Sequence, residues 1–386
     1  MLKTIRMIVC IFLLSCFSYA WAGAENSTVG DDIMLMENRI SDLLNSMTLE
    51  EKVYQLFIVK PESVAGVEKA TKATEATQKG FSKYPVGGIV YFSTNIVKES
   101  QIKQMIASSQ VYAKEKRGIG LFIAVDEEGG SIARVANNLE TTKIDSMKKV
   151  GQRGDPSEAY QIGATIAGDI SKLGFNLDFA PVADVIIEGR NTEIGSRSFG
   201  KDPSLVSAMV SQLVRGLQDN GVIGTLKHFP GHGSTIDNSH DGASITTRTL
   251  DDMEQTEFLP FQEGISAGVE FVMMSHLTAV EIDKEYPASL SQRIVTGILR
   301  EKLNFEGVII TDALKMNAVS DSYTSDEAAV LALQAGVDVL LMPVNLSKAA
   351  GGILDAVEIG RISQDRIDES VRRILRVKWK YGLISP

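Results

Sequence analysis

The chain has 386 residues, of which 44% are hydrophobic and 33 are glycine, and its 39 basic and 49 acidic side chains give a formal net charge of −10. This composition is typical of a globular protein with a sizeable core, not of a disordered or fibrous chain. Phosphate recognition needs clustered Lys and Arg, and no basic run offsets the negative charge, so we exclude nucleic acid as a partner.

The first 22 residues have the three regions of a secretory leader in the order that export requires. Two basic residues precede an apolar run from Met7 to Phe17, and the small-residue site Ala20-Trp21-Ala22 follows. We therefore predict a signal peptide over residues 1–22 and an exported protein, either periplasmic or extracellular. The segment Leu13-Leu14-Ser15-Cys16 offers an alternative, in which Cys16 is the lipidation site of a lipoprotein.

Both cysteines, Cys10 and Cys16, lie inside this leader. Disulfide bonds and cysteine catalysis are therefore not expected in the mature protein. No later stretch reaches the roughly 18 uninterrupted apolar residues of a membrane span, so no transmembrane segment is expected after the leader. Residues 23–33 are small and polar and are predicted to be a tether. Residues 34–386 are predicted to form one domain that ends in a C-terminal helix, in a protein that we expect to be a monomer.

The domain is predicted to open with an amphipathic helix from about Met34 to Met47, and Thr48 and Glu51 have the spacing of a capping box that begins a second helix. Beyond it, eight short apolar runs alternate with longer amphipathic segments. The runs, which we predict to be strands, are Leu56 to Val59, Gly88 to Phe92, Leu121 to Asp126, Leu177 to Pro181, Ile223 to His228, Phe271 to Ser275, Val308 to Asp312 and Val339 to Met342. The predicted helices between them include Pro156 to Leu173, Pro203 to Asp219, Leu250 to Ala267, Ser291 to Leu303 and Ser325 to Ala335.

The apolar runs are continuous in Val, Ile and Leu, as in parallel strands that are covered on both faces. Eight strand and helix units predict an α/β fold, and they favour a closed (β/α)8 barrel of the TIM type over an open doubly wound sheet. Polar side chains stand at the ends of the runs, where barrel enzymes place their catalytic groups. These residues are Asp126, Asp184, Lys227, His228, His276 and Asp312.

The four histidines of the chain cluster between positions 228 and 276. A metal site is one hypothesis, because His228 and His232 are four residues apart. Pro230 and Gly231 lie between them, however, and a helix that turned both rings toward one ion could not pass through these residues. We therefore expect neither a metal nor another cofactor. For His276, a hydrogen-bonded position in the core is as good an interpretation as a catalytic role.

The segment Lys227-His228-Phe229-Pro230-Gly231-His232-Gly233, which leads on to Ser239-His240, resembles the signature of family 3 glycoside hydrolases and, within it, of the β-N-acetylglucosaminidase (β-hexosaminidase) subgroup. Further matching segments follow in the family's order. They are Val125 to Gly130 with Arg134, Asn176 to Pro181, Ile194 to Phe199, Met274 to His276, Pro287 to Ser291 and Ile310 to Met316. The resemblance extends from about Leu49 to Pro343, and it implies that residues 34–386 are a barrel domain of this family's N-terminal type.

Retaining glycoside hydrolysis needs a carboxylate beneath the anomeric carbon and a proton donor for the leaving oxygen. The resemblance implies that Asp312 is the nucleophile, which forms a covalent glycosyl-enzyme, and that His240 is the acid and later the base. By its sequence context alone, Asp312 is better interpreted as the N-cap of a helix that starts at Ala313. The subgroup pattern assigns contacts with the sugar to Asp126, Arg134, Arg197, Lys227 and His228. For Asp126 and Arg134, a structural ion pair is the alternative.

One position departs from the subgroup. There, an aspartate two residues before the catalytic histidine orients it and supports its charged form, and here that position is Asn238. An amide can orient the ring but supplies no negative charge, so we expect His240 to be less basic than in its relatives, unless Asp237 or Asp241 compensates. Two alternatives follow: a catalytically weakened sugar-binding protein, or an N-acetylglucosaminide phosphorylase in which phosphate takes the place of the missing carboxylate.

The resemblance also implies the substrate. The subgroup hydrolyses terminal β-linked N-acetylglucosamine, in peptidoglycan fragments and in some members in chitooligosaccharides. We therefore expect a retaining exo-β-N-acetylglucosaminidase that works without a cofactor on a carbohydrate containing N-acetylglucosamine.

Overall fold

The computed structural model describes residues 32–189, 191–235 and 244–385, which belong to two units. In the smaller unit, a helix over residues 32–46 buries Ile40, Leu43 and Leu44, which have the spacing of one helix face. The helix begins two residues before its predicted start, so the last two residues of the predicted tether are helical. The predicted signal peptide, the rest of the tether and Cys16 lie outside the described residues.

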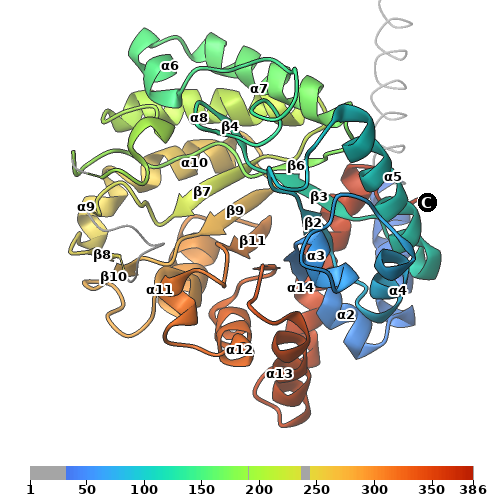
Figure 1. Ribbon diagram of the computed structural model, residues 1–386. Helices are drawn as coiled ribbons and strands as arrows, with labels where there is room; N and C mark the ends of the chain where they lie inside the picture. The colour runs from blue at the N-terminus through green and yellow to red at the C-terminus, as the bar shows by residue number, and fades with distance from the viewer. Residues whose placement is uncertain (1–31, 190, 236–243, 386) are drawn as a thin grey trace, which may run out of the picture. The chain divides into compact units, whose positions relative to one another are not determined.

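The larger unit, Met47–Ile384, has parallel strands in its middle and helices around them (Figure 1). All eight predicted strands are present. They are β1 (Phe57–Val59), β2 (Gly88–Val90), β3 (Phe122–Val125), β6 (Leu177–Asp178), β7 (Thr225–Phe229), β9 (Phe271–Met274), β11 (Val308–Thr311) and β12 (Leu340–Leu341). Every residue in them is buried, and full burial of an aliphatic or aromatic side chain stabilises the fold by about 1.5–3 kcal/mol.

The strands pair in parallel in two sheets, a five-stranded sheet β12-β1-β2-β3-β6 and a three-stranded sheet β11-β9-β7. Single parallel bridges also join the edges of the two sheets, Leu177 with Ile223 and Ile310 with Val339. The rings of Phe122 in β3 and Phe271 in β9 meet edge to face, with centroids 5.2 Å apart, so the two sheets share one core. The predicted α/β class is confirmed.

Helices connect the strands and cover them. The structure has α2 (Leu49–Gln55), α3 (Pro61–Ala65), α4 (Glu75–Lys83), α5 (Glu99–Arg117), α6 (Met147–Arg153), α7 (Pro156–Ser171), α8 (Pro203–Gln218), α9 (Leu250–Glu254), α10 (Phe258–Ser266), the π-helix η3 (Arg293–Lys302), α11 (Asn317–Ser320), α12 (Ser325–Ala335), α13 (Leu346–Glu358) and α14 (Gln364–Lys380). The predicted capping box is confirmed at α2, where the Thr48 hydroxyl accepts the Glu51 N–H and the Glu51 carboxylate accepts the Thr48 N–H. Within the described part of the chain, no helix has both the length and the apolar composition to cross a bilayer.

The helices α7 and α8 begin in the same way and pack closely. Each starts with Asp-Pro-Ser, and the carboxylate of Asp155 or Asp202 accepts the serine N–H at 2.9 or 3.0 Å. A Cβ at Gly216 of α8 would lie 2.2 Å from the carbonyl oxygen of Tyr160 in α7. Glycine is therefore required here for the two helix backbones to approach each other.

The helix predicted from Leu250 to Ala267 is wrong in one respect, because the chain forms two helices, α9 and α10, in that segment. Pro260 explains the break. Its ring would clash with the carbonyl four residues earlier and it has no N–H to donate, so a continuous helix cannot pass through it. In the structure, Pro260 falls in the first turn of α10, where an N–H has no partner within the helix.

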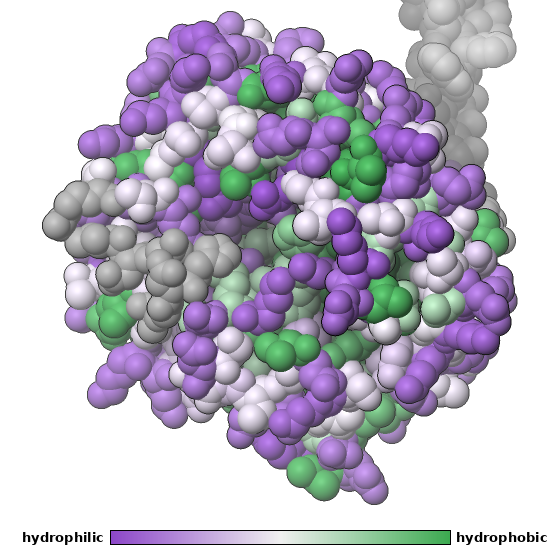
Figure 2. All heavy atoms as spheres, in the orientation of Figure 1, coloured by the Kyte–Doolittle hydropathy of each residue, from purple (hydrophilic) through white to green (hydrophobic). Residues whose placement is uncertain are grey.

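Short extra strands lie close to the ends of the parallel strands. Directly after β3, β4 (Glu127–Gly129) and β5 (Ile132–Ala133) form an antiparallel hairpin, and β8 (Ile245–Thr246) pairs in parallel with β10 (Thr278–Ala279). On the face that Figure 2 shows, hydrophilic side chains predominate and the hydrophobic ones are scattered. The hairpin matters for function because it carries acidic and basic side chains from β3 toward the neighbouring strand ends.

Candidate active site

Polar side chains at the carboxyl ends of the parallel strands line a cavity of about 360 Å³. All of the predicted site residues within the described part of the chain lie in its wall. They are Asp126, Arg134, Arg197, Lys227, His228 and Asp312. His240 and Asn238 lie outside the described residues. A larger cavity of about 720 Å³ beside Asp283 contains none of the predicted residues. Cavity size alone would therefore have indicated a different active site.

Lys227 and His228 are neighbours in β7, yet both line the cavity. In a regular strand, consecutive side chains point to opposite faces. Here the pairing with β9 shifts, because Lys227 lies opposite Met273 and Phe229 lies opposite Met274, so β7 advances by two residues while β9 advances by one. Such an irregularity re-aims a side chain, and it brings both residues to the same side.

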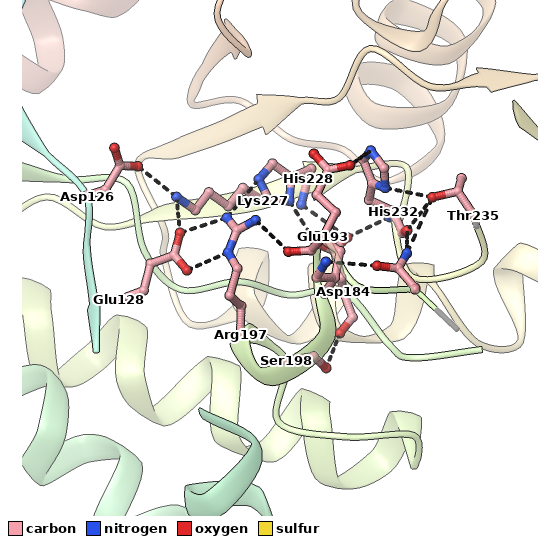
Figure 3. A network of polar contacts seen from close by, with 12 residues as sticks. Asp126, Glu128, Asp184, Glu193, Arg197, Ser198, Lys227, His228, His232 and Thr235 are labelled. Atoms are coloured by element: carbon pink, nitrogen blue, oxygen red, sulfur yellow. Dashed lines mark hydrogen bonds and ion pairs between the residues drawn. The ribbon is translucent and has the colours of Figure 1, made fainter. Parts of the chain in front are cut away.

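The ammonium group of Lys227 is buried between two carboxylates. Its Nζ lies 2.6 Å from Glu128 Oε1 and 3.0 Å from Asp126 Oδ1. Arg197 donates to the same Glu128 carboxylate through Nε and Nη2, each at 2.8 Å (Figure 3). Burial raises the pKa of Glu128, but Lys227 and Arg197 outweigh it and lower that pKa to about 2. Glu128 is therefore ionised at every physiological pH and holds two cations in fixed positions.

Asp184, which is fully buried, fixes both histidines of the motif (Figure 3). Its Oδ1 accepts the backbone N–H groups of His228 and His232 at 3.2 and 2.7 Å, and its Oδ2 lies 2.8 Å from His228 Nδ1. The other ring nitrogen of His228, Nε2, lies 3.4 Å from Arg197 Nη2, which can only donate. In its neutral form, His228 therefore carries its proton on Nδ1, toward Asp184.

Asp312 directly follows β11 and is half-buried in the cavity wall. Its Oδ1 accepts the Ala313 N–H at 2.7 Å. Burial raises the pKa of Asp312, but His228, His276 and the Ala313 N–H favour its ionised form and outweigh burial, so the net pKa is below the usual value. The helix-cap interpretation is wrong, because residues 313–316 are not helical and α11 begins after Met316. An ionised carboxylate therefore faces the cavity.

His276 supports the segment after Asp312. The ring is buried, with Nδ1 2.7 Å from the Ser289 hydroxyl and Nε2 3.1 Å from the carbonyl oxygen of Ala313. A carbonyl can only accept, so Nε2 carries the proton. Burial lowers the pKa of His276, which favours this neutral ring. The core interpretation of His276 is therefore the better one.

Asp126 and Arg134 form only a loose pair. Arg134 Nε lies 3.9 Å from Asp126 Oδ2, and this Nε has no hydrogen-bond partner in the described structure. The structural ion pair that we considered for these two residues is therefore weak, and both keep capacity for a ligand.

Two residues of the site were not assigned from the sequence. Glu128 lies inside a matching motif, and Asp184 was identified only as a polar residue at a strand end. The available signal was the run of three acids at Asp126, Glu127 and Glu128, which is unusual directly after a buried strand.

The described residues show no cluster of His, Cys, Asp or Glu that could hold a metal ion. An ionised carboxylate among fixed, directional donors can bind a polyhydroxylated ligand and attack an electrophilic carbon.

Comparisons with known proteins agree with this chemistry. Residues 48–377 match the model of the glycosyl hydrolase family 3 N terminal domain. The chain is 32% identical over 325 residues to beta-hexosaminidase A of Pseudoalteromonas piscicida, which covers 78% of this chain but only 54% of that protein. It is 34% identical over 287 residues to the beta-hexosaminidase of Stenotrophomonas maltophilia, covering 72% of this chain and 81% of the relative. Among solved structures, a family 3 beta-N-acetylglucosaminidase from Paenibacillus sp. str. FPU-7 superposes with a TM-score of 0.83 at 35% identity, covering 88% of this chain and 64% of the other.

Proposed function

The chain belongs to glycosyl hydrolase family 3, and we propose that it is a retaining exo-β-N-acetylglucosaminidase that releases terminal β-linked N-acetylglucosamine. The observation that supports this most is Asp312, an ionised carboxylate at the end of β11 in a cavity lined by charged donors. A rigid strand end can hold a carboxylate at the distance from the anomeric carbon that a retaining mechanism needs.

Asp312 is proposed as the nucleophile. One carboxylate oxygen bonds to the anomeric carbon while the bond to the leaving oxygen breaks and His240 gives its proton to that oxygen. His240 then takes a proton from a water molecule, whose oxygen attacks the same carbon and releases Asp312. Asn238 is proposed to orient His240. The roles of His240 and Asn238 rest on the sequence motif.

The sugar is proposed to contact Asp126, Arg134, Arg197, Lys227 and His228 through its hydroxyl and acetamido groups. Three of these side chains are fixed before a ligand arrives, because Glu128 holds Lys227 and Arg197 and Asp184 holds His228. Side chains that are already ordered lose little entropy on binding, so this arrangement favours affinity.

We further infer that the strands of the larger unit close into a (β/α)8 barrel. The bridge between Leu177 and Ile223 links β6 to the approach of β7, and the bridge between Ile310 and Val339 links β11 to the approach of β12. With these links, each of the eight parallel strands has a parallel neighbour on both sides. A closed barrel would explain why the polar strand ends converge on one cavity.

Peptidoglycan fragments or chitooligosaccharides are the proposed natural substrates. The protein would meet them outside the cytoplasm if residues 1–22 act as a signal peptide, so export belongs to the same proposal. These parts of the proposal rest on the sequence.

The test is turnover of para-nitrophenyl N-acetyl-β-glucosaminide by the exported chain. We expect nitrophenol and, as the first sugar product by NMR, the β-anomer of N-acetylglucosamine. A fluorinated N-acetylglucosaminyl fluoride, which slows breakdown of the intermediate, should add one sugar to the peptide that contains Asp312. A glycosyl phosphate as the product in phosphate buffer would overturn hydrolysis. Thermal protection by N-acetylglucosamine without any turnover would identify a binding protein instead.

A further inference from the structure

The chain at the start of the β4–β5 hairpin carries three consecutive acids, and they do not share one side. Asp126 and Glu128 both point toward the ammonium group of Lys227 and line the cavity (Figure 3). Side chains alternate along an extended strand, so Glu127, which lies between them, is directed away from the cavity. The described wall of the cavity does not include Glu127, and its side chain is buried. The proposed mechanism assigns no role to this buried carboxylate.

Glu127 holds the hairpin together from behind. Its Oε2 accepts the N–H of Val135 at 2.6 Å, and its Oε1 accepts the N–H of Ala136 at 3.0 Å. The N–H of Glu127 donates in turn to Oδ1 of Asp178, in β6, at 2.9 Å. The carboxylate therefore joins β4 to the segment that follows β5, and Asp178 attaches both to the parallel sheet. We call these three hydrogen bonds the hairpin clamp.

The hairpin clamp fixes the backbone that carries Arg134. The N–H of Arg134 donates to the carbonyl oxygen of Asp126 at 3.1 Å, and the next two N–H groups along the chain are those that Glu127 binds. The side chain of Arg134 forms a loose pair with Asp126, at 3.9 Å between Nε and Oδ2. The position of this proposed sugar contact therefore depends mainly on the backbone, and so on Glu127.

The hairpin clamp is strongest when Glu127 is ionised. Each oxygen of its carboxylate accepts one backbone N–H. Hydrogen bonds to an ionised acceptor are roughly twice as strong as those to a neutral one, and a protonated oxygen is a poor acceptor. Burial raises the pKa of Glu127 to about 7, although the N–H groups of Val135 and Ala136 lower it. Proton uptake near neutral pH should therefore loosen the segment after β5.

The other charged groups near Glu127 act in both directions. On the same hairpin, Arg134 favours the ionised form of Glu127 and Asp126 opposes it. From β6, Asp178 is fully buried, and burial raises its pKa well above the usual value. The charge of Glu127 raises that pKa further, while Lys227 of β7 lowers it without outweighing burial. A proton therefore favours Asp178, which leaves Glu127 as the ionised member of the pair.

We propose that Glu127 is a positioning residue whose ionised form holds the β4–β5 hairpin in its sugar-binding arrangement, so that affinity for N-acetylglucosamine falls when Glu127 takes up a proton. The inference rests on the proposed function, which assigns contacts with the sugar to Asp126 and Arg134. Glu127 acts through these two side chains and does not touch the substrate. Its loss should therefore raise KM more than it lowers kcat.

Calorimetric binding of N-acetylglucosamine to the wild type and to Glu127→Gln tests this proposal without the need for turnover. Glutamine keeps the shape of the side chain, but it presents an NH₂ group where the hairpin clamp needs a second acceptor. At pH 8.5 we expect the variant to bind the sugar roughly tenfold more weakly, as for the loss of one hydrogen bond to a charged group. At pH 5.5, where Glu127 of the wild type is protonated, the two Kd values should agree within about twofold. Their ratio cancels the titration of other site residues, which the two proteins share.

Kinetics and a matched control sharpen the result. On the nitrophenyl substrate at pH 8.5, Glu127→Gln should raise KM roughly tenfold and leave kcat within about threefold of the wild type. Glu140→Gln, at an exposed acid four residues after Ala136, should bind the sugar like the wild type at both pH values. A Kd ratio that stays the same at both pH values, or one close to unity at pH 8.5, would overturn the inference. The expected Kd ratios without any turnover would overturn the hydrolase function and leave the role of Glu127 intact.

Hydrogen exchange in the wild type decides the question if Glu127→Gln does not fold. After correction for the intrinsic effect of pH on exchange, the amides of Val135 and Ala136 should be protected roughly tenfold less at pH 5.5 than at pH 8.5. The amides of Ile309 and Ile310 in β11 are the internal reference and should keep their protection. Equal protection of the Val135 and Ala136 amides at both pH values would show that the hairpin does not respond to Glu127, and the inference would be wrong.

Discussion

Buried ionic groups occur at both ends of the parallel strands, and they differ in how completely they are paired. At the amino ends, Asp338 stands two residues before β12 and forms the Asp338 network with Ser370 and three arginines. Its Oδ2 accepts from Arg300 at 2.7 Å and from the Ile309 N–H at 3.1 Å. Its Oδ1 accepts from Ser370 at 2.6 Å and from Arg373 at 3.1 Å. Both carboxylate oxygens of Asp338 are therefore fully used within the protein.

At the carboxyl ends, the cavity network joins Asp126, Glu128, Lys227 and Arg197 and leaves capacity unused. Asp126 is half-buried and, within the described structure, Arg134 Nε has no hydrogen-bond partner and Asp312 accepts a single hydrogen bond, from the N–H of Ala313. A saturated network can only stabilise the fold, whereas polar groups that face a cavity with free capacity can bind a ligand. The comparison predicts that substitutions at the two ends will separate activity from stability.

The largest effect is expected at the cavity end, from Asp312→Asn. The amide keeps the shape but cannot attack carbon, so kcat on the nitrophenyl substrate should fall on the order of 10³-fold or more, while the melting temperature stays close to that of the wild type. Asp321→Asn, at an exposed aspartate nearby in sequence, is the control and should be fully active. A loss below tenfold would refute the assignment of the nucleophile.

The opposite pattern is expected from Asp338→Asn. Removal of the charge leaves three partly buried arginines without their common partner, and breaking such a pair costs about 3 kcal/mol of unfolding free energy. Urea unfolding measures the loss, and kcat of the folded enzyme at low temperature should stay within about twofold of the wild type, because the network lies outside the active site. A large loss of kcat with unchanged stability would show that the two ends are not functionally distinct.

Glu128→Gln should fall between these cases. It leaves Lys227 and Arg197 without their shared carboxylate, so we expect kcat/KM to fall roughly 10²-fold together with a lower melting temperature. If stability alone changed, Glu128 would be as purely structural as Asp338.

At the amino ends of the strands, the buried side chain of Lys378 couples stability to pH. This side chain of α14 is fully buried, donates to Gln55 Oε1 at 2.9 Å, and lies over the ring of Phe122 at the amino end of β3. Burial lowers its pKa to about 7. Above that pH the folded protein releases a proton that the unfolded chain keeps, so stability should rise between pH 7 and 9.5, by at most about 1.4 kcal/mol per pH unit.

Chemical unfolding at several pH values measures this slope, and Lys378→Met should flatten it without changing the pH profile of activity. An equal slope in the variant and the wild type would show that Lys378 is charged in the folded protein.

The smallest effect is expected from Asn238→Asp. The added carboxylate should favour the imidazolium form of His240, so the alkaline limb of the rate profile should move up by roughly half a unit to one unit. The measurement is the pH dependence of kcat on chitobiose, which needs protonation of its leaving group. An unchanged profile would indicate that another acid already supports His240, and lower activity would indicate that Asn238 is required.

Much of this arrangement could be predicted from local sequence. An unbroken apolar run such as Val308 to Thr311 suits only a strand that is covered on both faces, and a polar residue at its end, Asp312, has to lie at the edge of the sheet. The break between α9 and α10 was missed because the helical pattern of apolar residues outweighed the single signal of Pro260. The predicted tether extends two residues into the first helix, because the sequence marks the exact end of a helix only weakly.

The α/β class, the eight strands and the family follow from the sequence alone, because the spacing of apolar residues, the helix caps and the motifs are local properties. Which charges meet depends on the tertiary fold. The shift in register between β7 and β9 places Lys227 and His228 on one side, and the β4–β5 hairpin brings Glu128 to within 2.6 Å of Lys227, a residue 99 positions later in the chain. The register between strands and the charges that shift each pKa both involve residues distant in sequence. They are therefore defined only in the folded protein.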